Sequence, residues 1–179
     1  ARAELGSTLL ELGRLAEAEA ELLPAIAGFT GQLAVDHRIM IDLRCGEARL
    51  RLRQGRLAEA RGLLGTLLAL AHAKHGPRSV NVGLLGMTLG QALLDAKAAA
   101  EAEAVLQDSL IILEQLVPDD ANTVNCALLL ATAIVTGRGE VALARAVLTR
   151  TRERVLRGVD SGAWIGAIDA MVLSFGLPS

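Results

Sequence analysis

Aromatic residues are almost missing from this sequence of 179 residues, which has two Phe, one Trp and no Tyr. Proline is also scarce, with four residues, and runs of β-branched residues are few. Because sheets favour β-branched and aromatic residues, these shortages argue against a β-sandwich or a β-barrel. Hydrophobic residues still make up 52% of the chain. This composition predicts an all-α fold whose helices pack closely through small residues.

An excess of positive charge is absent as well, because 18 Lys and Arg stand against 20 Asp and Glu. We therefore expect neither nucleic acid nor a membrane as a partner. The longest apolar run, CALLLATAIV at 126–135, is too short to span a bilayer. We expect no secretory signal and a cytoplasmic location. The bias toward Ala, Leu, Arg and Gly is typical of a GC-rich bacterial source.

Residue patterns that carry chemistry are also lacking. Cys45 and Cys126 lie far apart without a CxxC motif, so two reduced thiols are expected. His72 and His75 could share one side of a helix end, but no third metal ligand is evident. Neither a phosphate-binding GxxxxGK[ST] loop nor a GxSxG motif occurs. We expect no catalytic residues, no metal, no cofactor and no enzymatic activity.

What the sequence does contain is an internal repeat. GRLAEA is written at 13–18 and again at 55–60, and a shift of 42 residues aligns four segments, 5–26, 47–68, 89–110 and 131–152. Four columns stand out: small residues at Gly6, Ala48, Gly90 and Thr132; turn positions at Gly13, Gly55, Lys97 and Gly139; alanines at 18, 60, 102 and 144; leucines at 22, 64, 106 and 148. Each segment is predicted to form a helical hairpin that turns at the Gly position. Lys97 predicts a different or strained turn in the third copy.

The periodicity predicts helices at 2–12, 15–33, 37–53, 57–74, 79–95, 98–116, 120–136, 140–157 and 162–175. Ser79, Asp119 and Ser161 are the expected N-caps after the linkers. We expect one repeat domain over 1–179, with units at about 1–35, 36–77, 78–118 and 119–159 and a terminal helix at 161–177. The first helix has no room for a cap, which favours a chain cut from a longer array.

The best-matched segments carry Leu-Gly followed by Leu, Ala and Leu, namely Leu5, Gly6, Leu9, Ala18 and Leu22, then Leu89, Gly90, Leu93, Ala102 and Leu106. This pattern resembles the tetratricopeptide repeat (TPR). The 42-residue period, and the linkers HGPRSVNV and VPDDANTV, are similar to those of kinesin-light-chain-like repeats and their bacterial relatives. The second segment departs most, because Glu47 and Arg51 replace leucines. Either that helix is rotated or its packing is more polar.

The resemblance implies a right-handed α-solenoid whose first helices line a concave groove, and a non-enzymatic scaffold, adaptor or sensor role with a protein or peptide partner. The expected groove residues are Asp42, Cys45, Arg49, Arg53, Leu84, Met87, Gln91, Leu94, Leu129 and Ala133. Thr88 and Leu130 stand where kinesin-light-chain-like repeats often carry Asn, so a hydrophobic or amphipathic helix fits better than a terminal carboxylate. Alternatively, these apolar residues only pack inside the superhelix.

The amino-acid sequence leaves two further questions open. Arg49 and Arg53 form either a contact for an acidic partner or part of a solvated helix with local pairs such as Glu47 with Arg51. The alternative to partner binding is self-association, in which exposed ends of the stack join copies of the chain into homo-oligomers.

Overall fold

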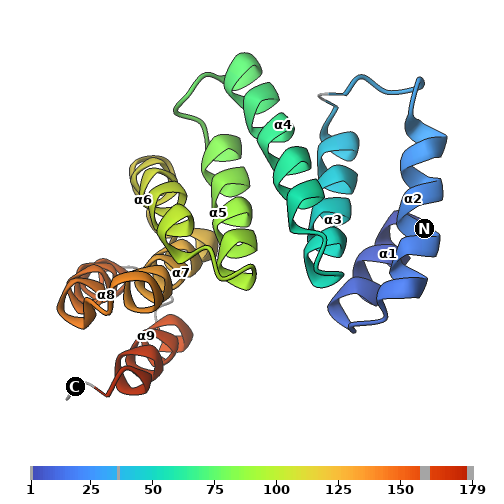
Figure 1. Ribbon diagram of the computed structural model, residues 1–179. Coiled ribbons are helices and arrows are strands. Elements are labelled where there is room, and N and C mark those ends of the chain that lie inside the picture. The colour runs from blue at the N-terminus through green and yellow to red at the C-terminus, as the bar shows by residue number, and fades with distance from the viewer. Residues whose placement is uncertain (1, 36, 158–161, 177–179) are drawn as a thin grey trace. The chain divides into compact units, whose positions relative to one another are not determined.

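The computed structural model describes residues 2–35, 37–157 and 162–176, and these residues form nine α-helices (Figure 1). The chain divides into two compact units, residues 1–77 and 78–179. The first unit contains α1 (Arg2–Glu11), α2 (Leu15–Phe29), α3 (Arg38–Arg53) and α4 (Leu57–His75). The second contains α5 (Val80–Asp95), α6 (Ala99–Leu116), α7 (Ala121–Arg138), α8 (Val141–Val155) and α9 (Gly162–Ser174). The all-α prediction is confirmed.

Every predicted helix is present, and the largest difference lies at the end of α2. That helix was predicted to reach residue 33 but ends at Phe29. Thr30 is extended, with ψ 126°, and its hydroxyl donates a hydrogen bond to the Ile26 carbonyl. Gly31 then takes a φ of 84°, which a helix cannot continue through. The pair Thr30-Gly31 thus ends the helix within an otherwise helical pattern.

The turns inside the hairpins follow the repeat. Gly13, Gly55 and Gly139 have φ values of 74°, 75° and 68°. Lys97 occupies the same column and adopts a φ of 61°, the one positive φ found at a described non-glycine residue. The strained turn predicted at Lys97 is therefore confirmed, because a side chain makes this left-handed backbone unfavourable.

Close contact between the two helices of a hairpin comes from the conserved columns of the repeat. The alanines at 18, 60, 102 and 144 are 0% exposed, and the leucines at 22, 64, 106 and 148 are at most 1% exposed. A Cβ atom added to Gly6 would lie 2.7 Å from Leu22 Cγ, and one added to Gly90 would lie nearer still to Leu106. The small residue in the first helix therefore seats the leucine of the second.

The predicted caps are partly right. The Ser79 hydroxyl accepts a hydrogen bond from the Val82 amide at 3.4 Å, so Ser79 caps α5. At α7 the cap is Asp120 rather than Asp119, since Asp120 Oδ1 accepts from the Asn122 amide at 2.7 Å. The prediction was wrong by one residue because the Asp119-Asp120 pair offers two equivalent capping groups. Ser161 lies outside the described residues.

Each unit has its own apolar core. In the first, buried residues of α1, α2 and α3 form one cluster, centred on Leu10, Leu22 and Leu50. In the second, buried residues of α5 to α9 form another, to which Ile168 of α9 belongs. Trp164 packs half-buried against this second cluster.

A polar cluster replaces part of the core of the first unit. The Arg51 side chain is 8% exposed and donates to Glu19 at 2.6 Å and to Glu47 at 3.4 Å. Its Nε lies 3.7 Å from a carboxylate oxygen of Glu59. Arg51 of α3 is thereby joined to α2 and to α4. The departure of the second segment from the repeat is thus explained by more polar packing, and the predicted pair of Glu47 with Arg51 is confirmed.

Candidate protein-binding surfaces

The predicted groove residues of the first unit all lie on α3. Asp42, Arg49 and Arg53 are exposed and Cys45 is half-buried. The guanidinium groups of Arg49 and Arg53 lie 3.6 Å and 3.8 Å from the carboxylate of Glu11 in α1. Arg53 also donates to the Leu10 carbonyl at 2.5 Å, which satisfies a carbonyl at the end of α1. The two arginines therefore join α3 to α1 while keeping 57% and 44% of their side-chain surfaces exposed.

The predicted groove residues of the second unit are more deeply packed. Leu84, Met87 and Leu94 of α5 are half-buried against the core cluster, and Leu129 of α7 lies in the same setting. Ala133 is 0% exposed, so it offers no surface to a partner in this structure. Gln91 is exposed and donates to the Asp95 carboxylate at 2.9 Å. This face is therefore partly core. The sequence had left open whether these apolar residues bind a partner or pack inside the superhelix.

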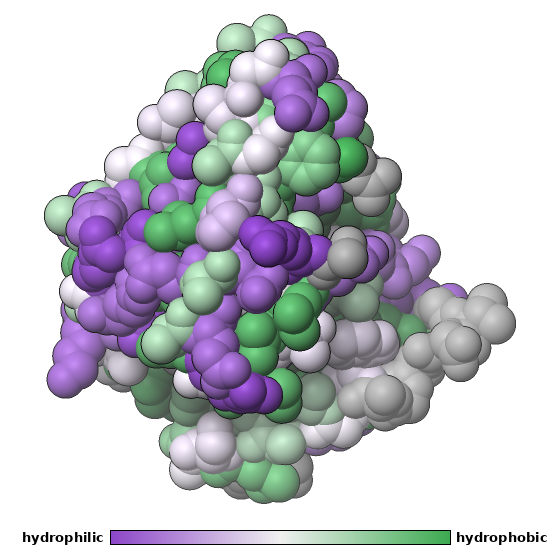
Figure 2. Space-filling view, turned by 90° about the vertical axis from the view of Figure 1, so that its right-hand side faces the viewer, coloured by the Kyte–Doolittle hydropathy of each residue, from purple (hydrophilic) through white to green (hydrophobic). Residues whose placement is uncertain are grey.

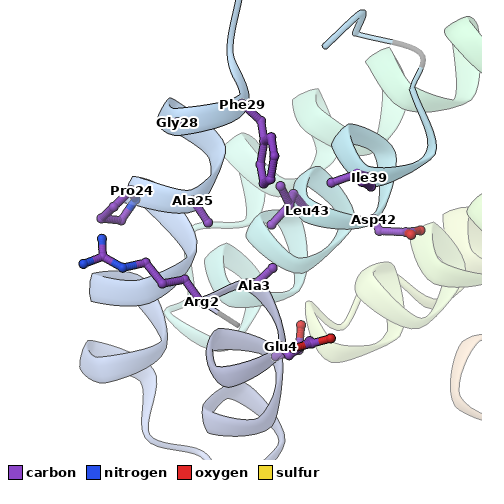
Figure 3. Close-up of a pocket in the computed structure, with 11 residues that line it drawn as sticks. Arg2, Ala3, Glu4, Pro24, Ala25, Gly28, Phe29, Ile39, Asp42 and Leu43 are labelled. Carbon is purple, nitrogen blue, oxygen red and sulfur yellow. The ribbon is translucent and has the colours of Figure 1, made fainter. Parts of the chain in front are cut away.

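A pocket of about 900 Å³ opens between α1, α2 and α3 within the first unit. Most of its walls are apolar or small, and charged residues stand among them; the lining residues are Arg2, Ala3, Glu4, Ser7, Pro24, Ala25, Gly28, Phe29, Ile39, Asp42 and Leu43. The Phe29 ring of α2 points toward Leu43 of α3 (Figure 3). On the side of the molecule where α1 and α2 lie, apolar areas are visible between hydrophilic side chains (Figure 2). We call the pocket of about 900 Å³ the α1–α3 pocket.

Sequence reasoning found one of these residues, Asp42, and missed the others. The pocket is lined by residues of three helices, and a column alignment shows only which residues are equivalent in successive hairpins. Phe29 was the available signal. It is one of two Phe residues in the chain, and an aromatic side chain buries a large apolar surface where it packs.

A second pocket of about 570 Å³ lies in the same unit, between the segment 30–35, α3 and α4. In the repeat, Thr30, Thr66 and Leu70 of this pocket correspond to residues 114, 150 and 154 of the second unit. There the Glu114 carboxylate lies 3.2 Å from Arg150 and 2.8 Å from Arg154, and these ion pairs bridge α6 and α8. The first unit has no acid–arginine pair in these columns, so its cleft is open.

The pKa values of both thiols are raised. Burial raises the pKa of Cys126 to about 12, with a smaller contribution from the Glu114 carboxylate. Burial and the charge of Asp42 raise the pKa of Cys45 to about 11, against the opposing effect of Arg49. Both cysteines are free. In the part of the chain that the structure describes, no group of three or more His, Cys, Asp or Glu is arranged to hold a metal ion.

Among the described helices, none combines the length and the apolar character that crossing a membrane requires.

The chain is similar to known proteins at the level of structure. No family model and no curated protein matches the sequence. A crystal structure of nearly identical TPR-like repeats from a putative kinesin light chain of Podosopora anserina matches with a TM-score of 0.80 and 19% identity, over 97% of this chain and 83% of that one. BtubC (BKLC) from P. vanneervenii matches with a TM-score of 0.71 and 15% identity, over 96% and 72% of the two chains. The chain therefore has the all-α, TPR-like repeat fold, as predicted.

Proposed function

We propose that this chain is a non-enzymatic protein-interaction module, a scaffold, adaptor or sensor domain, that binds a peptide or partner helix. The observation that carries the proposal is the α1–α3 pocket. Its volume of about 900 Å³ falls within the range of about 300–1,000 Å³ that is usual for ligand sites. Its apolar floor suits hydrophobic side chains of a partner, and TPR-like folds are a general type of interaction module.

Charged residues at the pocket set the orientation of a bound segment as well as adding to its affinity. Arg2, Glu4 and Asp42 line it together with apolar side chains such as Ile39 and Leu43. An amphipathic segment can bury one face against the apolar side chains and turn its polar face toward the charged ones. A wholly apolar segment would displace water from these charged groups, which costs free energy.

From Asp42 the proposed surface continues along α3. Cys45, Arg49 and Arg53 follow Asp42 at helical spacing, so they share one side of the helix. A partner that leaves the pocket along this side meets the exposed parts of two arginines. In the second unit, Leu84, Met87, Gln91 and Leu94, together with Leu129, provide a further, mostly apolar surface for contact.

The test is selection of a random peptide library on the immobilised chain, followed by affinity measurements on three proteins. Ile39→Glu places a charge in the pocket at a side chain that is 42% exposed, so the variant should fold. Leu156→Glu makes the same change at a leucine that is 51% exposed and outside the pocket. We expect selected peptides to bind the wild type and Leu156→Glu alike and Ile39→Glu at least tenfold more weakly, about 1.4 kcal/mol. Equal binding by all three proteins would reject the pocket as the binding site.

Self-association is a second candidate function, which α9 favours. Its described part contains a single charged residue, Asp169, and Leu173 is 60% exposed. Exposed apolar side chains of this kind can join copies of a repeat protein. Sedimentation over a range of concentrations should show an increase in mass that Leu173→Glu abolishes. A constant monomer mass would remove this candidate.

A further inference from the structure

The pocket of about 570 Å³ between the segment 30–35, α3 and α4, which we call the α3–α4 cleft, has a largely apolar lining. Six apolar side chains contribute to it, from all three parts of the chain: Leu33, Val35, Met40, Leu63, Leu67 and Leu70. Met40 and Leu67 are each 4% exposed and form the floor, whereas Val35 is 64% exposed at the rim. The volume lies within the range of about 300–1,000 Å³ that is usual for ligand sites.

The end of α2 keeps this cleft accessible. Two periods of 42 residues relate Phe29, where α2 ends, to Leu113, and α6 continues beyond that column to Leu116. The next column therefore holds Glu114 inside α6 but Thr30 in the extended segment after α2. Glu114 bridges α6 to α8 by ion pairs, whereas Thr30 is exposed and its hydroxyl bonds back to α2.

One arginine in the cleft has hydrogen-bonding capacity left over. Arg44 donates to Glu47 at 2.8 Å, its one hydrogen bond among the described residues, although a guanidinium has five N–H donors. Glu47 is also shared with Arg51 at 3.4 Å, so it does not balance Arg44 alone. Glu59 is fully engaged, because its two oxygens accept from Arg56 at 2.7 Å and 2.6 Å. The group that the cleft lacks is therefore an anion.

We infer that the α3–α4 cleft is a second protein-interaction surface, and that its occupant is a segment of a partner polypeptide with neighbouring apolar side chains and one carboxylate. The apolar side chains cover the half-buried Leu33, Leu63 and Leu70. The carboxylate accepts from the unused N–H groups of Arg44, whose side chain is 36% exposed. Because the rim is open at Val35, a polypeptide can continue beyond the cleft, as a small carboxylic acid does not.

This surface goes beyond the proposed function, since no described residue lines both the α3–α4 cleft and the α1–α3 pocket. The test therefore starts from the Ile39→Glu chain, in which the α1–α3 pocket carries a charge. Peptides from a random library are selected on this immobilised chain. Peptides that bind the cleft remain available for selection even if the α1–α3 pocket binds nothing, so the two proposals can fail separately.

Affinities of the selected peptides are then measured on variants made in the Ile39→Glu chain. Thr66→Trp fills the cleft from an exposed residue of α4, and Val35→Glu puts a charge at the exposed rim. Thr149→Trp is the matched control, because Thr149 is also an exposed helical threonine and lies outside the cleft. We expect Thr66→Trp and Val35→Glu each to weaken binding at least tenfold and Thr149→Trp to leave it unchanged.

A second comparison tests the carboxylate. The selected peptides should contain Asp or Glu, and replacing that residue by Asn or Gln should weaken binding about fivefold, as expected for a partly exposed ion pair. In the Arg44→Gln background the same replacement should have no effect, because the pair is already lost. An amide replacement that costs as much without Arg44 as with it would overturn the role of this arginine.

A selection that yields no peptide, or peptides that bind Thr66→Trp and Val35→Glu as well as the parent chain, would overturn the cleft as a binding surface. Sedimentation of the wild-type chain identifies the remaining occupant. A dimer that Thr66→Trp converts to monomer, and Thr149→Trp does not, would place a second copy in the cleft and overturn the assignment to a partner.

Discussion

The polar cluster around Arg51 makes a quantitative prediction about the stability of the first unit. We expect Arg51→Leu alone to lower the free energy of unfolding by about 3 kcal/mol, at the lower end of the range of about 3–5 kcal/mol for breaking a buried ion pair. The reason is that the Glu47 side chain, 10% exposed, loses one of its two cationic partners. The cost stays low in that range because Glu47 keeps Arg44 at 2.8 Å, and Glu19, which is 33% exposed, can be hydrated.

The reciprocal variant, Glu47→Leu, should cost less. Arg51 then keeps its hydrogen bond to Glu19 at 2.6 Å and one to Gln54 at 3.2 Å. A lost charged hydrogen bond is worth about 1.5–3 kcal/mol, so we expect about 1.5 kcal/mol for the weaker, 3.4 Å contact. The variant also removes the 2.8 Å contact to Arg44, which adds little because the Arg44 side chain is 36% exposed and can be hydrated.

The double variant Glu47→Leu/Arg51→Leu restores the leucines that the first and third segments carry in these columns. Replacing a buried ion pair by apolar residues is often neutral or stabilising. We expect the double variant to be about as stable as the wild type. The two single costs would then fail to add by about 4.5 kcal/mol, which is above the range of about 0.5–3 kcal/mol that is usual for residues in contact.

Urea unfolding followed by circular dichroism at 222 nm measures all four proteins. Arg49→Leu is the matched control, because Arg49 lies on the same helix with a side chain 57% exposed and should change stability by less than about 1 kcal/mol. An Arg51→Leu variant within about 1 kcal/mol of the wild type would refute this account of the cluster. So would single costs that simply add in the double variant.

Three further outcomes are expected. Hydrogen bonds from Arg51, and then from Gln54, lower the pKa of Glu19. Its contribution to stability is therefore full above the unfolded pKa of about 4.3 and is lost as pH falls below that value. Glu19→Gln should reduce the dependence of the unfolding free energy on pH in this range, and an unchanged dependence would contradict the pairing. Gly90→Ala should destabilise by about 1–3 kcal/mol through overpacking, whereas Gly62→Ala, with open space around it, should stabilise by about 0.5–1 kcal/mol; thermal unfolding separates the two, and equal signs would contradict the packing. Since burial raises the pKa of Cys126 to about 12, its thiol should react with Ellman's reagent at pH 8 only after urea unfolds the chain, and fast reaction in buffer would show an open core.

Helix positions could be predicted well because the signals are local. A 42-residue repeat with glycine at fixed columns shows where each hairpin turns, and Lys97 could be recognised as a strained turn from its column alone. The end of α2 was less accessible, since Thr30 and Gly31 interrupt a pattern that stays apolar afterwards. The choice between Asp119 and Asp120 as a cap depended on one residue of register, which periodicity does not resolve.

The candidate site was harder to predict because it depends on packing between helices. Ala133 and Gln91 share a column of the repeat, yet one is buried and the other exposed. A usable signal was nevertheless present for the arginines. Glu11 and Arg53 also share a column, and equivalent positions of neighbouring first helices lie close together in a stacked repeat. Opposite charges in one column therefore predict the contact that the structure shows at 3.8 Å.

Columns that keep the repeat and columns that break it thus carry different information. The buried alanines and leucines repeat because every hairpin needs the same contact between its helices. Glu47 and Arg51 break the pattern as a pair, and the cluster that they form ties α3 to α2 and α4. The α1–α3 pocket follows from neither kind of column. Its walls come from residues outside these columns, such as Phe29 of α2 and Ile39 and Leu43 of α3.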